Sequence, residues 1–148
     1  MGQDGADAMT QKPSEYLLAT FGAIVDRECR PLMDLFGFSI LEKKIHIPDV
    51  WVVLQNTTTN IVIDWELGAG CSIAIGRLSR FRKRVVQQFG LHKLAAVREP
   101  DLDIASLSRC PDFDPPTISL ALVNLVAILQ RVGADVLRGD FSVVKSLP

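Results

Sequence analysis

Three runs of β-branched and aromatic residues, joined by very short polar segments, constrain the fold of this chain most strongly. The runs span residues 50–57, 61–67 and 71–75. The second run alternates apolar with polar residues, which is typical of a strand with one buried face. The connecting segments, 58–60 and 68–70, are too short to cross over a sheet, so neighbouring strands must pair as antiparallel hairpins.

A further run, residues 38–47, precedes these three and carries apolar side chains on both parities. Ile40 and Ile45, for example, lie on opposite parities. One regular strand cannot bury both sets on one face, so we expect a β-bulge at residues 41–43. Together the four runs predict an antiparallel meander of about four strands.

Helical periodicity flanks the predicted strands. Apolar residues recur every three or four positions in residues 14–36, 79–90 and 115–132, which predicts one helix before the strands and others after them. The order of helix, antiparallel meander and C-terminal helices is that of an α+β protein built as a two-layer sandwich.

Proline, glycine and aspartate residues divide the helical segments. Pro31 predicts a kink or break at residues 27–30, because proline cannot donate the main-chain hydrogen bond of a helix. Asp114, followed by Pro115, predicts the N-cap of the last helix. Gly133 predicts its end.

Composition and the ends of the chain limit the class of protein. Of the 148 residues, 48% are apolar and 22% are charged, as in ordinary globular domains. We expect residues 1–12 to form a flexible polar tail and residues 13–148 a single α+β domain. The N-terminal residues lack the basic and apolar regions of a secretion signal. The apolar run 118–129 would span only about 18 Å as a helix, less than a bilayer core of about 30 Å, so we predict a cytoplasmic protein that does not cross a membrane.

The sequence predicts neither a metal or cofactor site nor an enzyme. Three cysteines without metal-binding spacing are expected to be reduced and buried, and four aspartates in a proline-bounded loop lack the calcium-loop pattern. Nucleophile and nucleotide-binding motifs are absent. The cysteines are Cys29, Cys71 and Cys110, and the aspartates are Asp101, Asp103, Asp112 and Asp114. The two histidines of the chain are His46 and His92.

One basic cluster is the candidate interaction site. It places five cations within eight residues of a chain whose net charge is −1: Arg77, Arg80, Arg82, Lys83 and Arg84. On the helix predicted for residues 79–90, such a cluster indicates a surface for phosphate groups or an acidic partner. The alternative interpretation is a solvated helix face without a binding role. The net charge makes nucleic acid an unlikely partner.

The last apolar helix, residues 118–129, is the second candidate for association. Apolar side chains surround it on more than one face, as Leu120 and Val123 illustrate. Either the sheet and the first helix cover it on two sides, or it contacts another chain, including a second copy. Trp51 and Trp65 are candidate aromatic anchors if exposed, although a place in the sheet core is the alternative for both.

Several segments resemble those of small bacterial proteins related to the immunity proteins of polymorphic toxin systems. The segments are LFGF (residues 35–38), VWVVLQNTTTNIVIDWE (50–66), SIAIGRL (72–78) and VLRGDFSVVKSL (136–147). The resemblance implies a bacterial cytosolic protein that binds a cognate protein without catalysis. It assigns no functional residue.

These observations predict a non-enzymatic protein-interaction module, with an immunity-type inhibitor as the form that the resemblance implies. Two alternatives remain open. The first is a small-molecule-binding or enzymatic domain with a pocket between sheet and helices. The second is nucleic-acid binding through residues 77–84.

Overall fold

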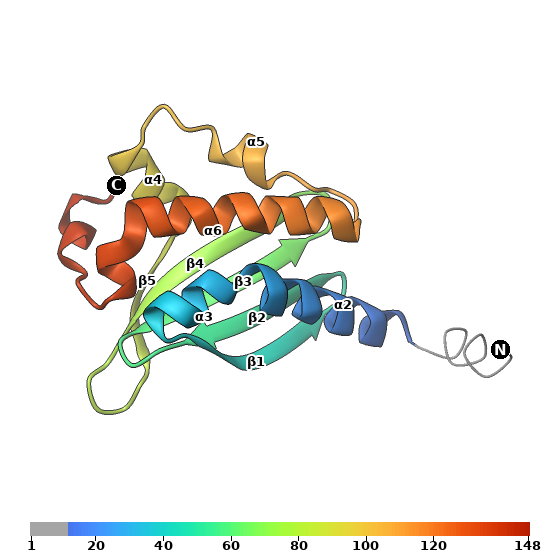
Figure 1. The fold of residues 1–148 in the computed structure, drawn as a ribbon, viewed down its shortest axis with the longest axis horizontal. Helices are drawn as coiled ribbons and strands as arrows, with labels where there is room; N and C mark the ends of the chain where they lie inside the picture. Colours follow the sequence, from blue (N-terminus) through green and yellow to red (C-terminus); the bar gives the residue numbers. More distant parts are fainter. Residues whose placement is uncertain (1–11) are drawn as a thin grey trace, which may run out of the picture.

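The computed structural model describes residues 12–148 and has one antiparallel sheet with helices packed on one face (Figure 1). The α+β arrangement predicted from the sequence is confirmed, but the sheet has five strands, in the order β1-β2-β3-β4-β5. The strands are β1 (Ser39–His46), β2 (Asp49–Gln55), β3 (Thr59–Glu66), β4 (Gly70–Leu78) and β5 (Val85–Gly90). The helices are α2 (Pro13–Glu28), α3 (Arg30–Phe36), α4 (Leu91–Arg98), α5 (Ile104–Ser108), α6 (Pro115–Leu137) and the 3-10 turn η1 (Ser142–Ser146). Except for Lys12, the predicted polar tail lies outside the described residues.

The fifth strand corrects the helix predicted for residues 79–90. Residues 79–84 form a turn, and β5 pairs with the outer edge of β4, with Phe89 opposite Ile75. The spacing of Phe81, Val85 and Phe89 fits a helix, but in β5 a register shift puts Val85 opposite Leu78 and Phe89 opposite Ile75, on opposite faces of the sheet. The edge of β4 offers main-chain hydrogen bonds that a helix would leave unmade. Lys83 reverses the chain with a φ of 52°.

The core lies between the sheet and the helices. On β3 the side chains of Ile61, Ile63 and Trp65 are at most 2% exposed, and they share one parity. They pack in one apolar cluster with Phe21 of α2 and Leu122 of α6. Strand alternation therefore turns one face of the sheet toward the helices and the other away from them.

The predicted breaks in the N-terminal half are confirmed. The first helical segment divides at Cys29 into α2 and α3, with Pro31 in the first turn of α3. Gly37 ends α3 with a φ of 73°, a conformation that glycine adopts without strain. The strand register shifts between Ile40 and Glu42, which places the expected bulge in β1.

The helix α6 begins as predicted but continues past its predicted end. Asp114 caps it by accepting a hydrogen bond from the N–H of Thr117. At Gly133 the backbone kinks without ending the helix, because the following Val136 and Leu137 are fully buried. A Cβ at Gly133 would lie 3.2 Å from Leu94, so α4 and α6 approach closely there.

The full length of α6 also corrects the length argument made from residues 118–129. At 23 residues the helix is long and apolar enough to cross a membrane, judged by length and composition alone. However, 56% of its most apolar window is buried inside the fold, as in the core helix of a soluble protein.

The side chain of Asn56, in the turn between β2 and β3, joins both helical segments to the sheet. Its Nδ2 donates to the carbonyl oxygens of Phe36 at 2.9 Å and Leu137 at 3.1 Å, which are the last residues of α3 and α6. Its Oδ1 accepts from the N–H groups of Thr58 and Thr59. One amide thus satisfies carbonyls that helix ends leave without partners.

The Asn56 contacts predict an unequal response to two isosteric substitutions. Asn56→Asp replaces the two donors with an acceptor that faces two carbonyl oxygens, and we expect it to lower the free energy of unfolding by about 3 kcal/mol. Asn124→Asp, at a half-buried position of α6, should change it by less than about 1 kcal/mol. Urea denaturation of both variants measures the difference, and equal effects would contradict the role of Asn56.

A second pair of substitutions tests which face of α6 is buried. Leu122 is fully buried, whereas Leu120 is 62% exposed. We expect Leu122→Ala to cost about 2–5 kcal/mol of unfolding free energy because it leaves a cavity. Leu120→Ala should cost less than about 1 kcal/mol, again measured by urea denaturation. A large loss for Leu120→Ala would mean that this side chain is covered in solution.

Candidate interaction surface

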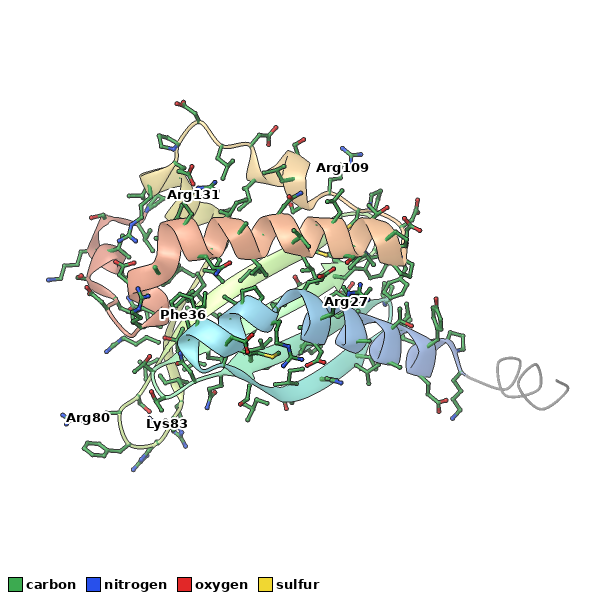
Figure 2. All side chains as sticks on the ribbon, in the orientation of Figure 1. Arg27, Phe36, Arg80, Lys83, Arg109 and Arg131 are labelled. Atoms are coloured by element: carbon green, nitrogen blue, oxygen red, sulfur yellow. The ribbon has the colours of Figure 1, made fainter. Side chains whose placement is uncertain are left out.

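The five predicted basic residues come together, on a β-hairpin and not on a helix face. Arg77 lies near the end of β4, and the other four lie in the turn before β5. The turn is closed by its own main chain, since the N–H of Ser79 donates to the carbonyl oxygen of Arg84 at 2.7 Å. Figure 1 shows this hairpin projecting beyond the rest of the molecule, and Figure 2 shows Arg80 and Lys83 at its far end. We call residues 77–86 the hairpin tip.

The cations of the hairpin tip are not neutralised by the rest of the fold. Within residues 12–148, no ion pair involves any of the five. The Nζ of Lys83 donates to the carbonyl oxygen of Thr57 at 2.6 Å, which leaves its charge without a carboxylate. The hairpin tip therefore carries a positive potential that an acidic surface would complement.

Apolar side chains are exposed among these cations. Phe81 is 87% exposed, and the guanidinium of Arg80 lies 5.6 Å from the centre of its ring. Val85 and Val86 are also exposed. Burying one such side chain in an interface is worth about 2 kcal/mol. The hairpin tip thus combines charge with an aromatic anchor, a combination enriched at protein interfaces.

The sheet face that turns away from the helices has its own small apolar centre. Val53 and Leu78 are 7% and 6% exposed, yet neither belongs to the core cluster beneath the helices. By strand alternation they lie on the opposite face, which we call the open face. Across it, the register aligns Val53 with Val62 and Val62 with Ala74. Half-buried Trp51 lies on the same face, two positions along β2 from Val53.

The end of the open face far from the hairpin tip carries three carboxylates, with Lys44 opposite Trp51 and His46 opposite Asp49 on the neighbouring β1. Asp64 stands opposite Trp51, and Val50 opposite Trp65, so the next positions along β2 and β3 place Asp49 beside Glu66. In the described part of the chain none of these three carboxylates forms an ion pair. We call Asp49, Asp64 and Glu66 the acidic end.

Two carboxylates of the acidic end have distinct surroundings. Burial raises the pKa of Asp64, and the nearby charge of Asp49 raises it further, while a hydrogen bond from Ser72 lowers it. The Oδ1 atom of Asp49 is buried and has no hydrogen-bond partner among the described residues.

Other residues considered in the sequence have structural roles. Trp65 is in the core and donates its Nε1–H to the carbonyl oxygen of Cys110 at 2.9 Å. Asp103 caps α5, as Asp114 caps α6. His46 is exposed on β1, and His92 lies against Gly90. Among the residues that the structure describes, no group of three or more His, Cys, Asp or Glu side chains could hold a metal ion.

The three cysteines are buried and free, as the sequence predicts. The Sγ atoms of Cys71 and Cys110 lie 3.6 Å apart. Burial, followed by the proximity of Cys110, raises the pKa of Cys71. Burial also raises the pKa of Cys29 to about 12, with smaller contributions from the charges of Glu28 and Asp26. These are protonated packing groups at neutral pH.

The fold also contains a small apolar cavity at the uncovered part of the β4 edge. Its volume is about 320 Å³. Beside it lies a more open hollow of about 650 Å³ that includes Glu66, Asp103 and Arg109. The cavity is lined by Cys71, Ser72, Ile73, Leu91, His92, Ile104, Ala105, Ser108 and Leu125.

Comparison of the chain with protein-family models, with curated proteins and with solved structures found no match. The resemblance to immunity proteins therefore stays a prediction, and the candidate surfaces rest on the chemistry of this chain alone.

The buried thiol of Cys29 predicts a loss of stability at alkaline pH. In the unfolded chain this thiol ionises near pH 9, whereas in the fold it stays protonated up to about pH 12. The protonated thiol therefore stabilises the fold fully below pH 9. Between pH 9 and about pH 12 the free energy of unfolding falls by about 1.4 kcal/mol per pH unit. We expect the difference in unfolding free energy between the native chain and Cys29→Ala to shrink from pH 9 to pH 10.5. A constant difference would contradict the burial of this thiol.

Proposed function

We propose that this protein is a non-enzymatic interaction module that binds an acidic protein surface through its hairpin tip. The observation that carries the proposal is the block of five cations without an ion-pair partner within residues 12–148, placed around the exposed ring of Phe81. Desolvating such cations is favourable only when anionic groups replace their water. The hairpin, held by strand pairing and by the bond from Ser79 to Arg84, presents them with a reduced ordering cost.

A protein partner accounts for this surface better than nucleic acid does. The net charge of the chain is −1, so the positive charge of the hairpin tip is balanced by acidic residues elsewhere in the chain. Phe81, Val85 and Val86 add apolar contact area, which a folded acidic protein can bury together with the charges. An immunity-type inhibitor is one form of this function, in which the hairpin tip occupies and blocks the partner's site.

Charge reversal at the tip tests this function. We expect Arg82→Glu with Arg84→Glu to reduce capture of acidic partner proteins from a bacterial lysate at least 10-fold, measured by quantitative mass spectrometry against the native chain. The matched control, Lys93→Glu with Lys145→Glu, changes the net charge equally at exposed positions without ion pairs in the described chain. It should capture the same proteins as the native chain.

Three results would reject the proposal. They are identical capture by the hairpin variant and the native chain, equal losses in both double variants, and preferential binding of a single-stranded DNA oligonucleotide over acidic proteins. The last result would instead support nucleic-acid binding, with an affinity that falls steeply with salt.

The apolar cavity at the β4 edge supports a second candidate, a small-molecule-binding domain. Its volume of about 320 Å³ suits a small apolar compound, and His92 and Ser108 supply polar groups at its wall. Filling the cavity with Ala105→Trp should abolish any thermal stabilisation by a library of such compounds while leaving capture by the hairpin tip unchanged.

A further inference from the structure

The geometry points to a binding site for a small uncharged cyclic amide in the apolar cavity at the β4 edge, where the amide pairs with main-chain groups of β4. This inference rests on the second candidate function, the small-molecule-binding domain, because it names the class of compound that the cavity takes. It does not depend on the hairpin tip. The observation that carries it is a gap in strand pairing that coincides with the cavity.

The outer edge of β4 is paired on both sides of this gap. β5 pairs with residues 74–78 of β4, and an isolated bridge joins Gly70 to Arg109. Between them, no strand of the described chain pairs with the outer edge at residues 71–73. Successive residues of an antiparallel strand direct their main-chain N–H and C=O groups to alternate sides. At least one of these three residues therefore directs both groups outward, away from β3.

The cavity lies along this gap and not above one face of the sheet. The side chains of Cys71 and Ile73 belong to the core beneath the helices. The side chain of Ser72 points to the open face, where its Oγ donates to Asp64. All three consecutive residues line the cavity. A space bordered by residues that face both ways must touch the edge of the strand, where the unpaired main-chain groups lie.

The other walls of the cavity are mainly apolar. They come from α4, α5 and α6 and include Leu91, Ile104 and Leu125. Among the described residues, the wall contains no Asp, Glu, Lys or Arg. Burying a charge without a partner is costly, whereas burying an apolar body is favourable. The cavity therefore favours an uncharged compound.

The volume and the strand edge together define the compound. The cavity measures about 320 Å³, about twice the ~150 Å³ that holds one benzene ring, so two fused rings fit. A cyclic amide presents an N–H donor and a C=O acceptor side by side, which matches the two groups that one strand residue directs outward. Its rings fill the apolar space while its amide satisfies the strand edge.

The open hollow beside the cavity gives a compound a side from which to enter. The two spaces adjoin at α5, since the walls of both include Ala105 and Ser108. Among the described residues, the charged groups of the hollow are Arg109, Glu66 and Asp103. One cation against two carboxylates gives an anionic compound no advantage there.

Three bicyclic probes of similar size test the class of compound by NMR titration of the full chain. They are 2-quinolone, which is a cyclic amide, naphthalene, which has no polar group, and 2-naphthoate, which is an anion. We expect 2-quinolone to bind at least about 10-fold more tightly than naphthalene, because of its hydrogen bonds to β4. It should bind at least about 100-fold more tightly than 2-naphthoate, because the cavity offers no partner for a charge.

Hydrogen exchange on the native chain tests the contact with the strand edge and needs no variant. At equal saturation, we expect at least one amide proton of residues 71–73 to exchange about 10-fold more slowly with 2-quinolone than with naphthalene. Two substitutions on α5 test the location. Ala105→Trp, which fills the cavity, should weaken the binding of 2-quinolone at least 10-fold, whereas Leu107→Trp, outside the cavity wall, should leave it unchanged.

Equal affinities for 2-quinolone and naphthalene would overturn the inference, as would equal exchange rates at residues 71–73 or tighter binding of 2-naphthoate. If Ala105→Trp still abolishes binding of naphthalene, the small-molecule-binding domain is retained without its amide selectivity. If none of the three probes binds, the inference fails, and the compound library decides the second candidate separately. Capture of acidic proteins by the hairpin tip is independent of all these results.

Discussion

The side chain of Asn56 is the contact on which the relation between the two layers depends. It lies where the turn between β2 and β3 meets the last turns of α3 and α6, and it bonds to carbonyl oxygens of both. Thr59, which is fully buried, adds a bond from its Oγ1 to the carbonyl oxygen of Val136 at 3.1 Å. These polar contacts fix the helical layer against one end of the sheet, while apolar packing holds it along the rest.

Within residues 12–148, the helical segments pack on one face of the sheet and leave the other face without a cover. The open face therefore has a small apolar centre with three carboxylates at one end, and its chemistry differs from that of the core. The same two-layer architecture lets β4 and β5 extend beyond the helices as a projecting hairpin (Figure 1). The candidate interaction surfaces are thus consequences of where the helices pack.

Most elements of the fold could be predicted from local patterns. Alternation in residues 61–67 indicated a strand, Pro31 indicated a break between helices, and Asp114 indicated a helix cap. Each of these signals depends on neighbours within a few residues, so tertiary contacts had little opportunity to override it. The helix predicted for residues 79–90 was wrong because its helical apolar spacing was overridden by strand pairing, with a register shift between Val85 and Phe89. Main-chain pairing with the edge of β4 decided the structure of this segment.

The sequence by itself determined the α+β class, the buried thiols, and the presence of a basic cluster in a chain of nearly neutral net charge. Only the tertiary structure decided that the cluster lies on a hairpin tip around an exposed Phe81. It also decided that Asp49, Asp64 and Glu66 meet on the face away from the helices. The physical reason is that charge and polarity are properties of single residues, whereas the distance between charged side chains on different strands depends on strand register. Register is established between strands and cannot be determined within any one of them.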